Sequence, residues 1–360
     1  MPASHSHAFA PGRVNLIGEP TDYNQGLALP FAIADGVTVG ARVDGPKAAH
    51  TSDPSAPCIH VRALDLGEED SFALDHIEGA SGWRAFVRGV AAELTGAGFP
   101  PPGAHLDISG GVPQGSGLSS SAALEVSLCL ALLELSPRSS ETSEVLDRTA
   151  IAQLCARVEN RWVGAHTGLL DQLASLYGQP NSALCIDFRT LDVQPVPLLL
   201  GDWQLIVLDS GERHAHASSG YNQRRAECAQ ACQLLGIASL RDATAEDLER
   251  LPEPLDLRLA HILGENQRVL DAVAALQAED MQAIAQLLNA SHHSLRDRYQ
   301  ISTPAVEATV ERLLRAGASG ARMVGGGFGG SVLALFAPGV PLPGGVRVVQ
   351  PGPGAHLLAA

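Results

Sequence analysis

Residues 12–26, GRVNLIGEPTDYNQG, gather ionisable side chains around a short apolar run near the start of the chain. The charged members are Arg13, Glu19 and Asp22, and Pro20 stands between the two carboxylates. A buried charged group survives only when it is paired or hydrogen-bonded. A loop that presents carboxylates and a guanidinium together suits the hydroxyls of a polyol. This segment therefore predicts a site for a ligand of that kind.

Residues 110–125, GGVPQGSGLSSSAALE, predict the end of a strand, a glycine-rich loop and the start of a buried helix. Gly115 and Gly117 allow the backbone to approach a ligand closely. The three serines at 119–121 lie at the helix start, where about four N–H groups lack intrahelical partners and the helix dipole has its positive end. The pattern predicts a phosphate cradle, although no Walker A sequence GK[ST] follows. An ordinary glycine turn with serine N-caps is the alternative.

A third glycine cluster, GGGFGG at 325–330, contains more glycine than a hairpin between two strands needs. It predicts backbone that lies against a ligand, with a flexible hairpin as the alternative. Two carboxylates come before it in the chain: Glu159 in an expected helix and Asp171 in an expected glycine-containing loop. Mg²⁺ usually takes one or two carboxylates beside phosphates, and an alcohol acceptor needs a carboxylate that can take its proton. Ordinary surface charge is the alternative explanation for these two residues.

The elements that must position these residues alternate between strands and helices. Residues 9–43 predict strands interrupted at glycine and proline, and further strands are expected at 58–64 and 105–109. Residues 119–135 are apolar nearly all round and predict a buried helix. The other expected elements are a helix at 141–163; strands at 183–188, 192–198 and 203–210; helices at 220–235, 256–277, 279–294 and 303–316; and strands at 320–324, 331–337 and 346–350.

The chain divides best in the stretch near 198–202. A length of 360 residues suggests two domains at roughly 150 residues each, so we expect an N-terminal domain at 1–198 and a C-terminal domain at 199–360. Because strands and helices mix in both parts, the predicted fold class is α+β.

Charge and cysteine content restrict the partners and the compartment. The chain has 39 acidic against 24 basic residues, a formal net charge of −15, whereas a nucleic-acid-binding face needs basic residues. The six cysteines form no CxxC pair and are expected to be free thiols in a reducing compartment. The sequence has no apolar signal core and no run of about 18 apolar residues. We therefore expect a monomeric cytoplasmic protein without membrane or nucleic-acid partners.

The three motifs, in this order, resemble those of the GHMP kinases, and within them the galactokinases. Residues 12–26 are similar to the galactokinase sugar signature, residues 112–124 to the phosphate loop of the superfamily, and residues 320–335 to its third motif. The segments GLLDQLASLYGQ, RHAHASSGYNQRR and HHSLRDRYQISTPAVEATV also resemble family motifs. The resemblance covers residues 9–336. It implies an N-terminal domain like ribosomal protein S5 domain 2, a ferredoxin-like C-terminal domain, and an active site in the cleft between them.

The resemblance also implies a reaction and a role for individual residues. The chain would use ATP and Mg²⁺ to phosphorylate the C1 hydroxyl of galactose, giving galactose 1-phosphate and ADP. Asp171 would accept the proton of that hydroxyl or orient it, and Arg13 would steady the phosphoryl group and keep Asp171 ionised. The other implied ligands are Glu19, Asp22, Gly168 and Tyr221 for sugar hydroxyls; Ser121 and Glu159 for Mg²⁺; Trp83 for adenine; and Gly115, Ser116, Gly117, Leu118, Ser119, Ser120 and Ser121 for the nucleotide phosphates.

Pro20 departs from the family pattern, which usually has a histidine at this position. Proline offers neither a side-chain hydrogen bond nor an N–H group, and one lost hydrogen bond is worth about 0.5–1.5 kcal/mol. We expect a changed preference around one sugar hydroxyl, that on C6. The alternatives are therefore a kinase of the same fold for a galactosamine derivative or arabinose, and a non-catalytic sensor of sugar and ATP. The phosphate loop, together with Glu159 and Asp171, favours a kinase over a sensor.

Overall fold

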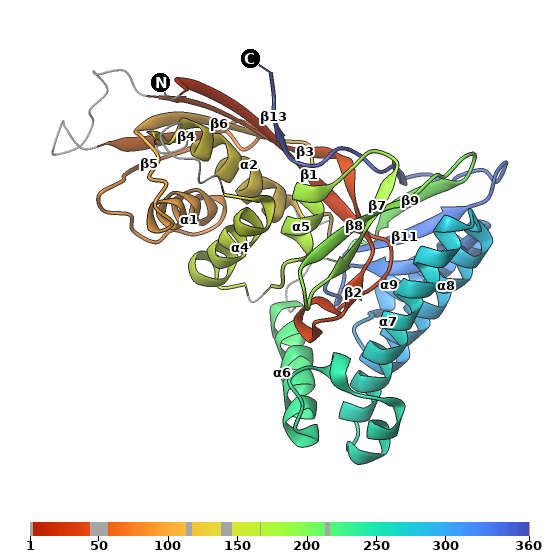
Figure 1. The fold of residues 1–360 in the computed structure, drawn as a ribbon. Coiled ribbons are helices and arrows are strands. Elements are labelled where there is room, and N and C mark those ends of the chain that lie inside the picture. Colours follow the sequence, from red (N-terminus) through yellow and green to blue (C-terminus); the bar gives the residue numbers. More distant parts are fainter. Residues whose placement is uncertain are drawn as a thin grey trace.

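The protein is described by a computed structural model over residues 3–43, 57–112, 117–137, 146–165, 167–212 and 217–359 (Figure 1). Its strands are β1 (His5–Asn15), β2 (Leu27–Ala28), β3 (Pro30–Val43), β4 (Cys58–Ala63), β5 (Glu68–Ala73), β6 (Ala104–Gly110), β7 (Ser182–Asp187), β8 (Asp192–Pro197), β9 (Gln204–Asp209), β10 (Ala318–Val324), β11 (Ser331–Phe336), β12 (Arg347–Val349) and β13 (His356–Leu357). Its longer helices are α1 (Trp83–Gly96), α2 (Ser120–Leu135), α4 (Arg148–Val158), α5 (Leu170–Tyr177), α6 (Ala217–Leu235), α7 (Leu255–Gln277), α8 (Met281–Ser294) and α9 (Pro304–Arg315).

A six-stranded sheet with the order β13-β1-β3-β6-β4-β5 organises the N-terminal half. The pairing is antiparallel except between β4 and β6. Helices α1, α2 and α4 lie together on one side of this sheet (Figure 1). Leu106 and Ile108 of β6 are buried between partly exposed neighbours, because alternate residues of a strand face opposite sides of a sheet. The alternation predicted for this strand is confirmed.

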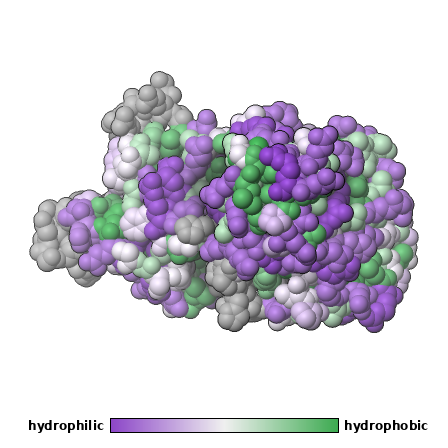
Figure 2. All heavy atoms as spheres, turned by 90° about the horizontal axis from the view of Figure 1, so that it is seen from below, coloured by the Kyte–Doolittle hydropathy of each residue, from purple (hydrophilic) through white to green (hydrophobic). Residues whose placement is uncertain are grey.

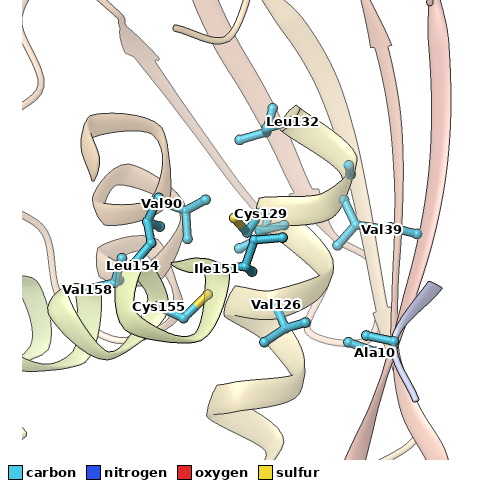
Figure 3. Packing of buried hydrophobic residues seen from close by; sticks show 14 of the residues in the cluster. Ala10, Val39, Val90, Val126, Cys129, Leu132, Ile151, Leu154, Cys155 and Val158 are labelled. Carbon is cyan, nitrogen blue, oxygen red and sulfur yellow. The ribbon is translucent and has the colours of Figure 1, made fainter. Parts of the chain in front are cut away.

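Helix α2 is the centre of the N-terminal core, as its all-round apolar sequence predicts. It lies between the strands that carry Ala10 and Val39 and the helices that carry Val90 and Ile151 (Figure 3). Leu132, near its C-terminal end, is fully buried. A helix with apolar residues on every side is stable only when neighbours cover all of them. The position of α2 therefore fixes the place of its N-terminus, where the serines lie.

Strand β3 corrects one expectation, because it runs on through Gly36 where the sequence predicted an interruption. It pairs with β1 on one side, with a register shift between Pro11 and Arg13, and with β6 on the other side from Val37 to Val43. An added Cβ at Gly36 would lie 2.5 Å from the ring of Phe9. The glycine therefore makes room for an aromatic ring across the ladder and does not form a turn.

The C-terminal half contains a four-stranded sheet with the order β10-β11-β9-β12. Strand β9 pairs with both β11 and β12, which confirms the predicted central strand. Helices α8 and α9 pack on β10, and β2, β7 and β8 form a small third sheet. Mixed sheets and helices in both halves confirm the predicted α+β class. The chain finally returns to the first sheet, where β13 pairs with β1, and the division near residue 198 stays a prediction.

The helices of the second half occupy the predicted segments, and all six cysteines are free thiols. The helix expected at 141–163 begins at Arg148, with residues 138–145 outside the described part. No helix among the described residues is both long and apolar enough to span a bilayer. Figure 2 shows the face seen from below as mostly hydrophilic, with hydrophobic residues in several separate areas.

The contact between α8 and β10 gives a test of the packing. An added Cβ at Gly320 would lie 2.7 Å from the Cα of Ala285, so Gly320→Ala is expected to cost about 1–3 kcal/mol through overpacking. Gly96→Ala, at a position with open space around it, is the matched control and is expected to be neutral or stabilising by about 0.4–1 kcal/mol. Urea unfolding measures both. Equal stabilities for the two variants would contradict this packing.

Candidate active site

A cavity of about 300 Å³ brings together segments that are distant in the sequence. The first motif, the segment around Asp171, helix α6 and the third glycine cluster all contribute to its wall. Its lining residues are Arg13, Glu19, Pro20, Asp22, Gly164, Ala165, Thr167, Gly168, Leu170, Asp171, Tyr221, Asn222, Gly325, Gly326 and Gly327. All the predicted sugar ligands and both predicted catalytic residues are therefore found in one cavity.

Arg13 and Asp171 form an ion pair in the wall of this cavity. The Arg13 Nε donates to Asp171 Oδ1 over 2.8 Å, and Nη2 lies 2.7 Å from the same oxygen. The hydroxyl of Ser119 donates to the other carboxylate oxygen, Oδ2. The predicted pairing of Arg13 with Asp171 is confirmed. Asp171 was expected in a loop, but it lies in the first turn of α5.

Arg13 also contacts the phosphate loop predicted from the sequence. Its Nη1 donates to the carbonyl oxygen of Gly117 over 2.6 Å, and its backbone N–H donates to the carbonyl of Leu118. An added Cβ at Gly12 would lie 2.5 Å from that Leu118 oxygen, so only glycine allows the strand and the loop to approach so closely. One guanidinium therefore links the start of α2 to the carboxylate of α5.

Glu19 is buried, and the protein itself occupies both of its carboxylate oxygens. Arg322 Nη2 donates to Oε2 over 2.6 Å, and the backbone N–H of Gly325 donates to Oε1 over 2.8 Å. Burial raises the pKa of Glu19, and the nearby Arg322 acts in the opposite direction. The carboxylate therefore joins the first motif to the third glycine cluster, and this structural role does not depend on a ligand.

Asp22 lies directly over Gly168 in the cavity wall. A Cβ added to Gly168 would overlap the carboxylate of Asp22, so a side chain at 168 would displace it. Burial raises the pKa of Asp22 to about 6, and the charge of Asp171 adds to this shift. Hydrogen-bond donors from a ligand would favour the ionised carboxylate over its protonated form.

Tyr221 of α6 contributes an aromatic ring and a hydroxyl to the cavity. Its ring meets that of Tyr23 edge-on, with 5.5 Å between the centroids. The Tyr23 hydroxyl in turn lies 2.5 Å from the hydroxyl of Tyr299. Burial raises the pKa of Tyr221 well above its usual value, with Asp22 as the next cause. Tyr221 is therefore a neutral phenol at physiological pH.

A second acidic group lies behind Asp171, around Glu159. Thr167 Oγ1 and Gln172 Nε2 both donate to Glu159 Oε2, and Gln172 also donates to the buried Glu125 over 2.7 Å. Burial and the charge of Asp171 raise the pKa of Glu159 to about 7. Burial and the charge of Glu159 raise the pKa of Glu125 well above its usual range. Two buried acidic groups therefore tend to hold protons on this side of α5, and a bound cation would favour their ionised forms.

A second cavity, of about 480 Å³, lies on the other side of the start of α2. Ser120 and Ser121 line it together with Trp83 and Phe86, whereas Ser119 reaches Asp171 in the first cavity. Trp83 Nε1 donates to Glu68. Ser119 occupies the N-cap position of α2, as the alternative expected, but its side chain makes no capping hydrogen bond. The predicted Gly115 and Ser116 lie outside the described residues.

Several residues at the site were not found from the sequence. Arg322, which pairs with Glu19, looked like an ordinary strand residue, and no local pattern marks it as buried. Gln172 lies next to Asp171, yet its bond to Glu159 depends on the packing of α5 against α4. His261 and Glu265 stand one helical turn apart on α7. That spacing signals a shared face but gives no hint of what the face contacts.

Family models match three parts of the chain. The GHMP kinases N terminal domain matches residues 85–179, the galactokinase galactose-binding signature residues 3–43, and the GHMP kinases C terminal model residues 272–341. The first two models together cover every N-terminal residue that lines the first cavity. The third includes Gly325–Gly327.

Curated relatives match the chain over most of its length. A galactokinase of Mycobacterium tuberculosis is 44% identical over 333 residues, which are 91% of this chain and 87% of the relative. A galactokinase of Roseiflexus sp. is 40% identical and covers 92% of this chain and 84% of its own.

Solved structures with the same fold cover nearly the whole chain. The Lactococcus lactis galactokinase complexed with galactose has a TM-score of 0.87 at 32% identity, covering 98% of this chain and 95% of its own. The Methanococcus jannaschii mevalonate kinase, at 18% identity and a TM-score of 0.63, covers 93% of this chain and 92% of its own and shows the shared fold.

The buried Glu19–Arg322 pair gives a test of how the site is held together. Replacing Arg322 by methionine leaves the Glu19 carboxylate buried without its cation, so Arg322→Met is expected to cost about 3–5 kcal/mol in urea unfolding. The control is Arg315→Met, which removes an ion pair whose side chains are 75% and 66% exposed and which should cost about 1 kcal/mol or less. If both variants lost the same stability, the buried pair would not have this structural role.

Proposed function

Because the chain belongs to the galactokinases of the GHMP kinase superfamily, we propose that it transfers the γ-phosphoryl group of ATP to the C1 hydroxyl of galactose. The products are galactose 1-phosphate and ADP. The observation that carries this proposal is the ion pair of Arg13 with Asp171, because the same guanidinium also contacts the carbonyl of Gly117 in the phosphate loop. The acceptor carboxylate and the donor loop are thus joined by one positive charge.

We propose that Asp171 accepts the proton of the C1 hydroxyl as the bond to phosphorus forms. The oxygen that now takes the Ser119 hydroxyl, Oδ2, is the one that Arg13 leaves free. Arg13 holds the carboxylate by its ion pair and places positive charge where the transferring group passes. Phosphoryl transfer needs positioning and charge stabilisation more than covalent help. The ion pair positions Asp171 as the base and Arg13 as the stabilising cation.

Galactose would occupy the cavity of about 300 Å³. We propose that Asp22, the Tyr221 hydroxyl and the backbone of Gly168 hydrogen-bond its hydroxyls, with Glu19 contributing through lone pairs that Arg322 and Gly325 do not use. Pro20 adds an apolar side chain that has neither a donor nor an acceptor. We therefore propose that Pro20 changes the specificity of the enzyme around one sugar hydroxyl, that on C6. Sugar analogues test this preference.

ATP would bind on the other side of the start of α2. We propose that the adenine occupies the cavity lined by Trp83 and Phe86. The phosphates would then meet Ser120, Ser121 and the free N–H groups at the positive end of the α2 dipole. Anionic phosphates bind well at such a helix start. The first residues of α2 would separate the sugar from the nucleotide and direct the γ-phosphate toward Asp171.

Mg²⁺ fits the chemistry of the donors at this position. Glu159 is a buried carboxylate whose pKa is raised to about 7 by burial and by Asp171, and a bound cation favours the ionised form. We propose that Glu159 and Ser121 hold Mg²⁺ together with phosphate oxygens, as hard oxygen donors do. When bound, the ion neutralises charge on the phosphates.

We also propose a monomeric state and a cytoplasmic location, which are expectations from the sequence alone.

The proposed activity is tested by ADP release with galactose, 2-deoxygalactose, galactosamine, N-acetylgalactosamine, arabinose and glucose. Galactose is expected to give the highest kcat/KM. Asp171→Asn should bind galactose but lose about 10²–10⁴-fold in kcat, the usual contribution of a general base. Near-normal turnover of that variant would defeat base catalysis. Saturable sugar binding without ADP release from the wild type would indicate a sensor, and a preference for another sugar would overturn galactose alone.

The contact of Asp22 with Gly168 predicts a defect that is specific for the sugar. Gly168→Ala displaces the Asp22 carboxylate, and a hydrogen bond to a charged group is worth about 1.5–3 kcal/mol. We expect the KM for galactose to rise roughly ten- to hundred-fold, with the KM for ATP unchanged. Gly79→Ala, where an added Cβ meets nothing, serves as the control. An unchanged KM for galactose in Gly168→Ala would remove Asp22 from the sugar site.

A further inference from the structure

Helix α7 holds the wall of the sugar cavity from behind, without lining the cavity itself. His261 and Glu265 are fully buried and stand one turn apart on this helix. The backbone N–H groups of Gly18 and Glu19 lie 3.0 Å and 3.4 Å from Glu265 Oε1, and both donate to it. His261 Nε2 lies 2.8 Å from the carbonyl oxygen of Glu19. The helix thus binds the N–H and the C=O of the same residue.

The surroundings of His261 fix which ring nitrogen carries the proton. Burial lowers the pKa of His261 to about 4, so the ring is neutral and has one N–H group. The carbonyl oxygen of Glu19 can only accept, and therefore Nε2 is the donor. Nδ1 then accepts from the hydroxyl of Ser294, 2.8 Å away on α8. The ring of His261 on α7 therefore accepts a hydrogen bond from α8 and donates one to the first motif.

Glu265 is ionised in spite of its burial. Burial by itself would raise its pKa, but the nearby charges of Arg268 and Arg322, with a hydrogen bond from Ser291, lower it to about 2. Arg268 Nε and Ser291 Oγ donate to the carboxylate over 2.7 Å each. Hydrogen bonds to an ionised acceptor are stronger than neutral ones, so the two loop N–H groups are held firmly.

Glu19 is consequently fixed at every polar group that it has. Glu265 takes its N–H, His261 binds its C=O, and Arg322 and Gly325 bind its carboxylate. Pro20 and Asp22 follow directly and line the cavity. A shift of the Glu19 backbone would therefore also move Asp22, whose carboxylate lies over Gly168.

We propose that His261 and Glu265 are positioning residues for the sugar site: they set the place of Pro20 and Asp22, and with it the affinity for galactose, without touching the sugar. This inference rests on the proposed function. It assigns α7 a role in binding the sugar and none in binding ATP or in the transfer step. The backbone and the carboxylate of Glu19 are held by different elements. Helix α7 binds the backbone, whereas β10 and the glycine cluster bind the carboxylate.

The test compares two amide variants that each retain one half of the ring. In His261→Gln the side-chain amide reaches the position of Nε2 and can still donate to Glu19. In His261→Asn it reaches the position of Nδ1 and can bond only Ser294. We expect His261→Gln to keep the galactose Kd within about twofold and His261→Asn to weaken it about two- to twelve-fold, the range for one hydrogen bond. Calorimetry without ATP measures the Kd, and kinetics give kcat and the KM for ATP, both unchanged.

Leu259→Ala, a fully buried residue of α7 in the core away from the cavity, is the control for lost stability. It should lower the melting temperature and leave the galactose Kd unchanged. Equal Kd values for His261→Gln and His261→Asn would overturn the inference, as would a parallel rise in the KM for ATP. If either amide variant fails to fold, Glu265→Gln is measured in its place and should weaken galactose binding without changing the KM for ATP. A wild-type protein that binds no galactose would defeat the proposed function and this inference together.

Discussion

The buried carboxylate of Glu19 is the constraint on which the site depends. A charge removed from water needs a partner and hydrogen bonds, and Glu19 finds them in Arg322 and the N–H of Gly325. These partners belong to β10 and to the glycine cluster, some 300 residues further along the chain. The first motif can therefore remain buried only when the C-terminal half is folded against it. The wall of the sugar cavity is thus a product of both halves.

Charge balance also explains the arrangement around Asp171. Four carboxylates of this region, those of Asp22, Glu125, Glu159 and Asp171, face few positive groups, and burial raises the pKa of the first three. Among the described residues, Arg13 forms its ion pair with Asp171. In the proposed complex, sugar hydroxyls would bind on one side of α5 and Mg²⁺ on the other. Helix N–H groups and the metal ion would then supply the positive potential that an acidic protein needs to bind an anionic nucleotide.

Close backbone approach is the third physical requirement, and glycine meets it at a few positions. Gly12 brings β1 against the carbonyl of Leu118, and Gly168 leaves room for the carboxylate of Asp22. In the third cluster Gly325, Gly327, Gly329 and Gly330 have positive φ, a conformation that residues with a Cβ rarely adopt. The cluster is the connection of the antiparallel hairpin that β10 and β11 form, and its first three residues, Gly325, Gly326 and Gly327, also line the cavity.

The sequence by itself determined the α+β class, most element positions and the residues that meet in the cavity, because those properties follow from local periodicity and from motifs that are contiguous in the chain. The pairing of Arg13 with Asp171 was predicted from the resemblance to the galactokinase motifs, and it agrees with the need of a buried charge for a partner. Local patterns misplaced Gly36 and put Asp171 in a loop, since strand pairing and the packing of α5 override local preferences. Arg322, His261 and Glu265 were out of reach for the same reason. Their roles depend on contacts with residues more than 240 positions away, and only the tertiary structure decides which buried groups meet over such separations.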